Sequence, residues 1–177
     1  MLKVETARLI LVPFEAEAID ALLRGDEARL TQLTGFSFPR PLRPPPLMAE
    51  VLPLVRDRLR DDPGSLGWWT WLTADRNTQR VTGALGFGGP PDAEGAVMIG
   101  YATYPGADHR GFATEATDAL VKWALAQPGV DRVCASIPPD NVPARRVAEK
   151  VGMRVAGTVW EEDIDDVLLY EKRREGR

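Results

Sequence analysis

The stretch ADHRGFATEA at 107–116 places a glycine, small residues and basic residues where a strand turns into a helix. The first amides of a helix lack partners within it, and the peptide dipoles add partial positive charge, so such an end attracts phosphate. Gly111 permits unusual dihedrals, and Ala113 leaves room for a ligand. His109 and Arg110 add donors. These types suit a pyrophosphate, while a turn that binds nothing is an equal alternative.

Other residues that could do chemistry are few. Cys134 is the only cysteine, so no internal disulfide can form, and its apolar surroundings in VCASI predict a buried, inert thiol. His109 is the only histidine. One histidine and one cysteine do not make the usual zinc ligand set, and we expect no metal.

Composition limits the function classes. Of the 177 residues, 44% are apolar and 27% charged, which is typical of a globular chain, and we expect one domain over residues 1–177. The net charge of −4 gives no electrostatic attraction for nucleic acid. The N-terminus lacks a secretory apolar core, and no apolar run is long enough to span a bilayer. We therefore expect a cytoplasmic protein that contacts neither nucleic acid nor membrane.

Periodicity and turn residues predict a mixed α/β chain in the order β-α-α-β-β-β-α-β-α-β-β. The expected strands lie at 7–14, in a hairpin over 68–89, and at 95–105, 130–137, 153–162 and 165–173. The expected helices lie at 15–26, 47–62, 114–127 and 138–152. The proline-rich segment 38–47 is read as a stiff loop between two helices, and a polyproline ligand for a partner is the alternative.

Several segments, in order, resemble the GNAT superfamily of acyl-CoA-dependent N-acetyltransferases, and within it the Rim-type branch that modifies ribosomal proteins. The resemblance covers nearly the whole chain. It rests on ETARLILVPF, VTGALGF, IGYATYPGADHRGFATEA, DNVPARRVAEKVGMR and DDVLLYEK. Gly111 and Ala113 stand at the Gly-x-Gly/Ala positions of the pyrophosphate motif, followed by Thr114, Glu115 and Ala116.

The resemblance implies a central V-splayed mixed sheet flanked by helices. It implies that acetyl-CoA, the co-substrate, binds in the split between the strand ending near Tyr104 and the strand at 131–137. The helix beginning at Ala113 would cap the pyrophosphate, and main-chain groups near Ala102 would pair with the pantetheine arm. The implied cofactor-binding residues are Ala102, Thr103, Tyr104, His109, Arg110, Gly111, Phe112, Ala113, Thr114 and Asn141.

The sequence departs from the family at the proton-transfer positions. Met98 stands where many relatives carry Glu, Ala144 where the branch often has Ser acting on the leaving sulfur, and Val151 near the usual Tyr. No motif position therefore identifies a base or an acid. The remaining candidates for catalysis, with water relaying the proton, are Glu94, Tyr104, Glu161 and Glu162. For the three glutamates, solvated surface charge is the alternative.

The first functional hypothesis is an N-acetyltransferase in which a primary amine attacks acetyl-CoA directly in a ternary complex. The amine is a protein N-terminus or a small molecule. The second is a non-catalytic acyl-CoA-binding or regulatory module, and the third is an interaction protein built on the prolines of 38–47. Exposed sheet edges are compatible with a homodimer.

Overall fold

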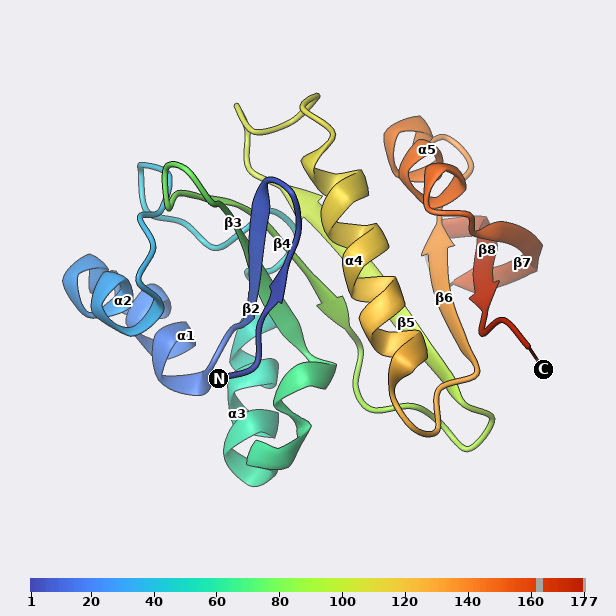
Figure 1. The fold of residues 1–177 in the computed structure, drawn as a ribbon, viewed down its shortest axis with the longest axis horizontal. Coiled ribbons are helices and arrows are strands. Elements are labelled where there is room, and N and C mark those ends of the chain that lie inside the picture. The colour runs from blue at the N-terminus through green and yellow to red at the C-terminus, as the bar shows by residue number, and fades with distance from the viewer. Residues whose placement is uncertain (162–163, 177) are drawn as a thin grey trace.

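One mixed β-sheet organises the chain in a computed structural model that describes residues 1–161 and 164–176 (Figure 1). Its strand order is β1-β2-β3-β4-β5-β6-β8-β7, and all neighbours are antiparallel except β5 and β6. The strands are β1 Val4–Glu5, β2 Leu9–Pro13, β3 Thr70–Asp75, β4 Val81–Phe87, β5 Ala96–Thr103, β6 Arg132–Ile137, β7 Arg154–Glu161 and β8 Ile164–Arg173.

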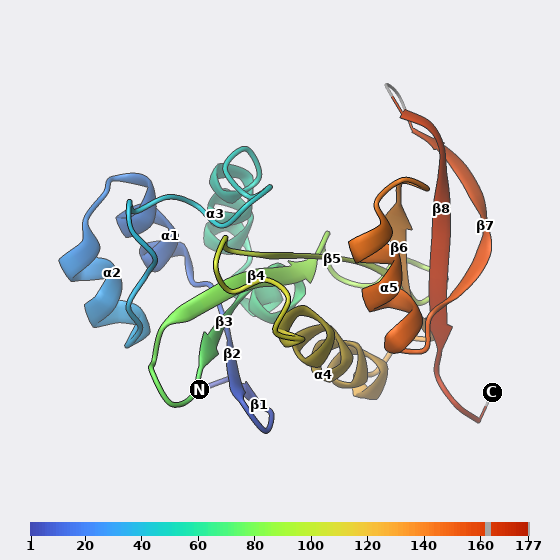
Figure 2. The ribbon, with the colours of Figure 1, turned by 90° about the horizontal axis from the view of Figure 1, so that it is seen from above.

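Helices cover both faces of this sheet. They are α1 Ala16–Leu23, α2 Glu27–Thr34, α3 Leu52–Asp61, α4 Phe112–Ala126 and α5 Val142–Lys150, with a 3₁₀ helix η1 at Pro63–Trp68. Viewed from above, α3 and α4 lie on opposite sides of the central strands (Figure 2). The parallel pair β5–β6 needs a crossover, and α4 supplies it. Within the described residues, no helix is both long and apolar enough to cross a membrane.

Each face of the sheet has its own hydrophobic core. Under α4 and α5 the core includes Trp71 and Leu120, both fully buried. Under α1, α2 and α3 a second core is built around Phe14, Ile19 and Leu72. Apolar residues alternate between these two cores along β3, which explains why a strand flanked by helices on both sides reads as almost continuously apolar.

The sheet splits between β5 and β6. Their parallel register runs from Ala96 opposite Arg132 to Met98 opposite Cys134, and then it stops. Beyond that point β5 continues to pair with β4 as far as Thr103, and β6 pairs only with β8. The two strands spread apart toward their carboxyl ends (Figure 1). This is the V-splayed mixed sheet that the sequence predicted, and the fold class is confirmed.

Every strand and helix expected from the sequence is present, but some boundaries differ, and β1 and α2 were not expected. The helix expected over 47–62 begins only at Leu52, because Leu47 has a positive φ of 66° and the following residues form turns. Helix α2 was missed, since only Leu30 of its residues is buried and its apolar pattern is weak. Its ends carry local signals: Asp26 accepts from the Arg29 amide, and Gly35 ends it in a left-handed conformation.

Candidate active site

The N-terminus of α4 opens into a cavity of about 370 Å³ between α4 and α5. The amides of Phe112, Ala113 and Thr114 precede the first helical bond, which runs from the Glu115 amide to the Gly111 carbonyl. None of the three amides donates a hydrogen bond within the described part of the chain. Ala113, Thr114 and Thr103 line the cavity. The predicted anion seat is therefore a concave site with free donors at its base.

The loop before α4 is shaped by left-handed residues. Gly111, the N-cap, has φ 77° and ψ 8°, and His109 has φ 60°. The Asp108 carboxylate turns back on its own loop and accepts from the Gly106 amide at 3.0 Å. A Cβ at Gly111 would point toward Arg8 Nη2, 3.4 Å away. Glycine is thus required by the backbone of this loop, whereas the side chain of Ala113 faces the cavity.

Two cationic side chains that the sequence analysis missed line the same cavity. Arg146 and Lys150 project from α5, and both are exposed. Neither side chain makes a hydrogen bond or ion pair in the described part of the chain. Their spacing of four residues, with Pro143 and Val147 beside them, places them on one face of α5. The four-residue spacing could have indicated from the sequence that the two cations share a face of α5. Only the packing of α5 beside α4 shows that this face lines the cavity.

Arg110 is directed elsewhere. Arg110 lines a separate cavity of about 290 Å³ together with Pro39 and Arg80. The Arg110 carbonyl accepts a hydrogen bond from Arg8 Nη1 at 2.8 Å. His109 does line the cavity between the helices, with its side chain 89% exposed. Of the two basic residues predicted to meet a phosphate, His109 is thus positioned to do so.

The backbone of β5 contributes a second element of the site. The Tyr104 amide donates to the Thr82 carbonyl at 2.9 Å, and the Met98 carbonyl accepts from the Gly88 amide at 3.1 Å. Both bonds lie on the β4 side of β5. Because the backbone groups of successive strand residues point to opposite sides, the odd-numbered residues of β5 direct theirs toward β6.

Past the last paired position, no strand of the described residues lies beside that edge of β5. The backbone groups of Tyr101 and Thr103 face the split, whereas Ala102 lies opposite Ala84 in β4. Unpaired strand edges bind extended ligands by adding hydrogen bonds of the ladder type. Thr103 also lines the cavity at α4, so the split and the anion seat are continuous.

A polar network ties the N-terminal segment to the start of α4. The Glu115 carboxylate accepts from Thr6 Oγ1 at 2.6 Å, from the Arg8 amide at 2.8 Å and from Arg8 Nε at 2.6 Å. The Arg8 guanidinium also lies over the Phe112 ring, 4.7 Å from its centroid. Arg8 thus holds both the loop and the first turn of α4, which explains why a residue so early in the chain belongs to the site.

We expect Glu115→Gln to lower the free energy of unfolding by about 1 kcal/mol at neutral pH. Burial raises the pKa of Glu115, but hydrogen bonds from Thr6 and Arg8 outweigh it, so the net pKa is below its ordinary value. The stabilisation is therefore present above the unfolded-state value of about 4.3 and is lost as pH falls through the lower folded pKa. Urea unfolding of both proteins at a series of pH values checks this. A difference that stays constant into acid would contradict it.

Of the four predicted catalytic residues, the structure describes the side chains of Glu94 and Tyr104, and it places them apart. Glu94 lies at the closed end of the β5–β6 pair, where it accepts from Arg132 at 3.0 Å with its side chain 78% exposed. Tyr104 belongs to the core under α1, α2 and α3, and its hydroxyl donates to the Arg43 carbonyl at 2.8 Å. Burial raises its pKa. Glu162 and the Glu161 side chain lie outside the described residues.

Two further residues act structurally. Asn141 Oδ1 caps α5 by accepting from the Ala144 amide at 3.2 Å. Cys134 is buried, and burial raises the pKa of its thiol, which fits the predicted inert role. Among the described residues, no group of His, Cys, Asp and Glu side chains gathers closely enough to hold a metal ion.

Comparison with known proteins decides the family. A family model described as an acetyltransferase (GNAT) domain matches residues 8–154. The chain belongs to the GNAT acetyltransferase family. The matched range begins at Arg8 and contains the split between β5 and β6, α4 and α5.

Individual relatives agree with this membership. This GNAT domain is 30% identical over 155 residues to the uncharacterized N-acetyltransferase YjdG of Bacillus subtilis, covering 86% of this chain and 89% of that protein. A GNAT-family acetyltransferase from Bacillus anthracis superposes with a TM-score of 0.67 at 21% identity, covering 98% and 99% of the two chains. RimL, a ribosomal L7/L12 alpha-N-protein acetyltransferase solved in complex with coenzyme A, gives 0.69 at 18% identity, covering 99% and 100%. The protein is therefore an acetyltransferase.

Proposed function

We propose that the protein transfers an acetyl group from acetyl-CoA to a primary amine by direct attack within a ternary complex. The observation that carries the proposal is the α4 cavity, with free helix amides at its base and Arg146 and Lys150 on its wall. Amides at a helix N-terminus and cationic side chains are the groups that bind pyrophosphate. The unpaired edge of β5 continues from this cavity into the sheet, where an extended arm can follow it.

In this reading the chain acts mainly by positioning its substrates. The amine nitrogen attacks the thioester carbon, the C–N bond forms, and the C–S bond breaks with its electron pair going to sulfur. Unpaired amides of β5 at Tyr101 and Thr103 are placed to donate to the oxygen that becomes negative. Water takes the ammonium proton, and Glu161 and Glu162 are the predicted groups that receive it. Glu94 is excluded from this step by its place at the closed end of the strands.

For the acceptor we propose a protein N-terminus first. Two proteins of similar structure are a ribosomal L7/L12 alpha-N-protein acetyltransferase and a ribosomal-protein-S5-alanine acetyltransferase. The net charge of −4 favours the approach of a cationic amine. Small-molecule amines are the second class to test.

Calorimetric titration with acetyl-CoA, followed by release of free CoA thiol with a panel of amines, tests the proposal. The panel contains peptides with N-terminal serine or alanine, polyamines and amino acids. We expect tight binding of acetyl-CoA and thiol release with at least one acceptor class. If acetyl-CoA binds and no amine is acetylated, the alternative of a non-catalytic acyl-CoA-binding module replaces the proposal. If acetyl-CoA does not bind, both readings fail.

A further inference from the structure

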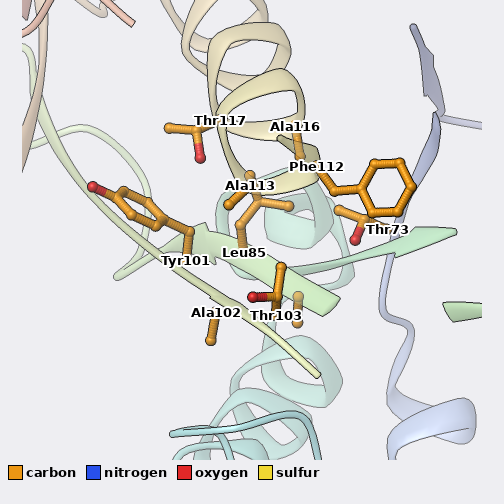
Figure 3. Close-up of a pocket in the computed structure, with 10 residues that line it drawn as sticks. Thr73, Leu85, Tyr101, Ala102, Thr103, Phe112, Ala113, Ala116 and Thr117 are labelled. Atoms are coloured by element: carbon orange, nitrogen blue, oxygen red, sulfur yellow. The ribbon is translucent and has the colours of Figure 1, made fainter. Parts of the chain in front are cut away.

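Tyr101 spans the split from β5 to α5. Its side chain lies on the α4 and α5 side of the sheet, and its hydroxyl donates to the Ala144 carbonyl at 2.7 Å. Figure 3 shows its ring leaving β5 away from the first turn of α4, with the hydroxyl at its outer end. The Tyr101 hydroxyl therefore lies between β5, which carries the residue, and α5, which it contacts.

The residue that the Tyr101 hydroxyl contacts, Ala144, is one of the three at which this chain departs from the family pattern. Ala144 stands where the resemblance implies a serine hydroxyl near the leaving sulfur. The structure shows a different hydroxyl in contact with that same residue. A missing side chain on α5 is thus matched by a tyrosine that reaches α5 from β5.

The position of Tyr101 along the split also suits contact with the thioester end of the ligand. Thr103 lines the anion seat, and Tyr101 is the next residue inward whose backbone faces the split. A ligand with its phosphates at α4 and its arm along this edge runs past Thr103 toward Tyr101. Its far end, which carries the thioester, then lies near the Tyr101 hydroxyl.

The other tyrosine near α5 is less well placed. The Tyr170 side chain is 1% exposed, and its hydroxyl already donates to Glu149 at 3.1 Å and accepts from Arg145 at 3.3 Å. The Tyr101 side chain is only partly buried, and its hydroxyl donates to a backbone carbonyl. Exchanging that carbonyl for a sulfur that becomes negative strengthens the bond, because hydrogen bonds to charged acceptors are stronger than neutral ones.

We infer that the Tyr101 hydroxyl donates the hydrogen bond that stabilises the leaving sulfur, in place of a side-chain hydroxyl at position 144. The inference rests on the proposed use of acetyl-CoA. The tyrosine keeps its proton: the C–S electron pair goes to sulfur, and solvent protonates the thiolate after release. Burial, with Tyr170 nearby, raises the pKa of Tyr101, which keeps the hydroxyl protonated as a donor.

The test compares Tyr101→Phe with the wild type in two measurements. Turnover at saturating acetyl-CoA is expected to fall roughly ten- to hundredfold, the effect of one hydrogen bond to a charged group. The second measurement needs no acceptor: ultraviolet absorbance follows ionisation of the thiol of bound CoA against pH. Loss of the donor is expected to raise the pKa of that thiol by about one unit. Acetyl-CoA affinity is expected to stay unchanged.

Two variants provide rescue and control. Ala144→Ser in the Tyr101→Phe background adds a hydroxyl on the residue that Tyr101 contacts and is expected to recover part of the lost turnover. Tyr170→Phe removes a hydroxyl from a buried side chain on β8 and is expected to lower only thermal stability. If Tyr101→Phe leaves thiol ionisation and turnover unchanged, or if Tyr170→Phe reproduces its effects, the inference is overturned.

Failure of this inference is distinct from failure of the proposed function. The inference about Tyr101 fails if the wild type binds CoA and transfers acetyl groups and Tyr101→Phe behaves identically. The proposed function fails if the wild type does not bind CoA, which overturns both. If Tyr101→Phe does not fold, the wild type still decides, because a bound thiol that ionises no more easily than free CoA contradicts a donor at the sulfur.

Discussion

Replacing Ala113 with glutamate is expected to weaken acetyl-CoA binding about a hundredfold, or roughly 3 kcal/mol. Ala113 is the second residue of α4, and it lines the cavity proposed to hold the pyrophosphate. A carboxylate there faces the phosphate charges and competes for the free amides. An acid in the first turn stabilises the helix itself, so the variant is expected to fold normally. Calorimetry gives the affinity, and thermal unfolding verifies the fold.

Ala113→Gln is the matched control, because it has the same size without the charge. Its affinity is expected to fall by roughly tenfold or less, since only steric crowding remains. Equal losses for Glu and Gln would indicate that space rather than charge limits the site. Unchanged affinity in Ala113→Glu would place the pyrophosphate elsewhere. Gly111 is a poorer probe, because its φ of 77° strains any side chain and its Cβ direction leads to Arg8.

The double variant Arg146→Ala with Lys150→Ala is expected to weaken acetyl-CoA binding about thirtyfold, or roughly 2 kcal/mol. Both side chains line the cavity and are exposed, so each contact is screened by solvent and contributes only part of what a buried pair would. The difference from wild type is expected to shrink as salt is added, because exposed charges are screened at short range. Calorimetric titrations at low and high ionic strength measure both effects.

Arg24→Ala with Arg58→Ala removes the same formal charge from exposed positions on α1 and α3, away from the cavity. This control is expected to leave the affinity at the wild-type value. If it weakens binding as much as the α5 variant does, net charge rather than contact explains the effect. The assignment of Arg146 and Lys150 would then be wrong.

Local patterns identified most of the fold. Alternating or continuous apolar residues marked the strands, and the apolar stripe of 114–127 marked α4, because a side chain's face follows from its place in the element alone. The helix expected at 138–152 was found for the same reason, although α5 begins only at Val142, with Asn141 as its cap. Helix α2, with one buried residue, had too little apolar pattern to be found.

The candidate site was only half readable. The glycine and small residues of 107–116 identified the anion seat, because free amides at a helix start are a local property. Arg110 shows the limit: its type suits a phosphate, yet the loop turns its side chain into another cavity. Tyr104 is a second example in which residue type did not reveal the surroundings of the side chain, because its hydroxyl donates to the Arg43 carbonyl.

By itself, the sequence determined most of the elements, the family and the stretch proposed to bind an anion, since each depends on neighbours within a few residues. Tertiary structure decided which distant residues complete the site. Arg8 reaches Glu115 from the bend before β2, Arg146 and Lys150 reach the cavity from α5, and Tyr101 reaches Ala144 across the split. These contacts depend on where the β5–β6 register stops and how far the strands then spread. That geometry is set by the packing of whole layers, which no local pattern encodes.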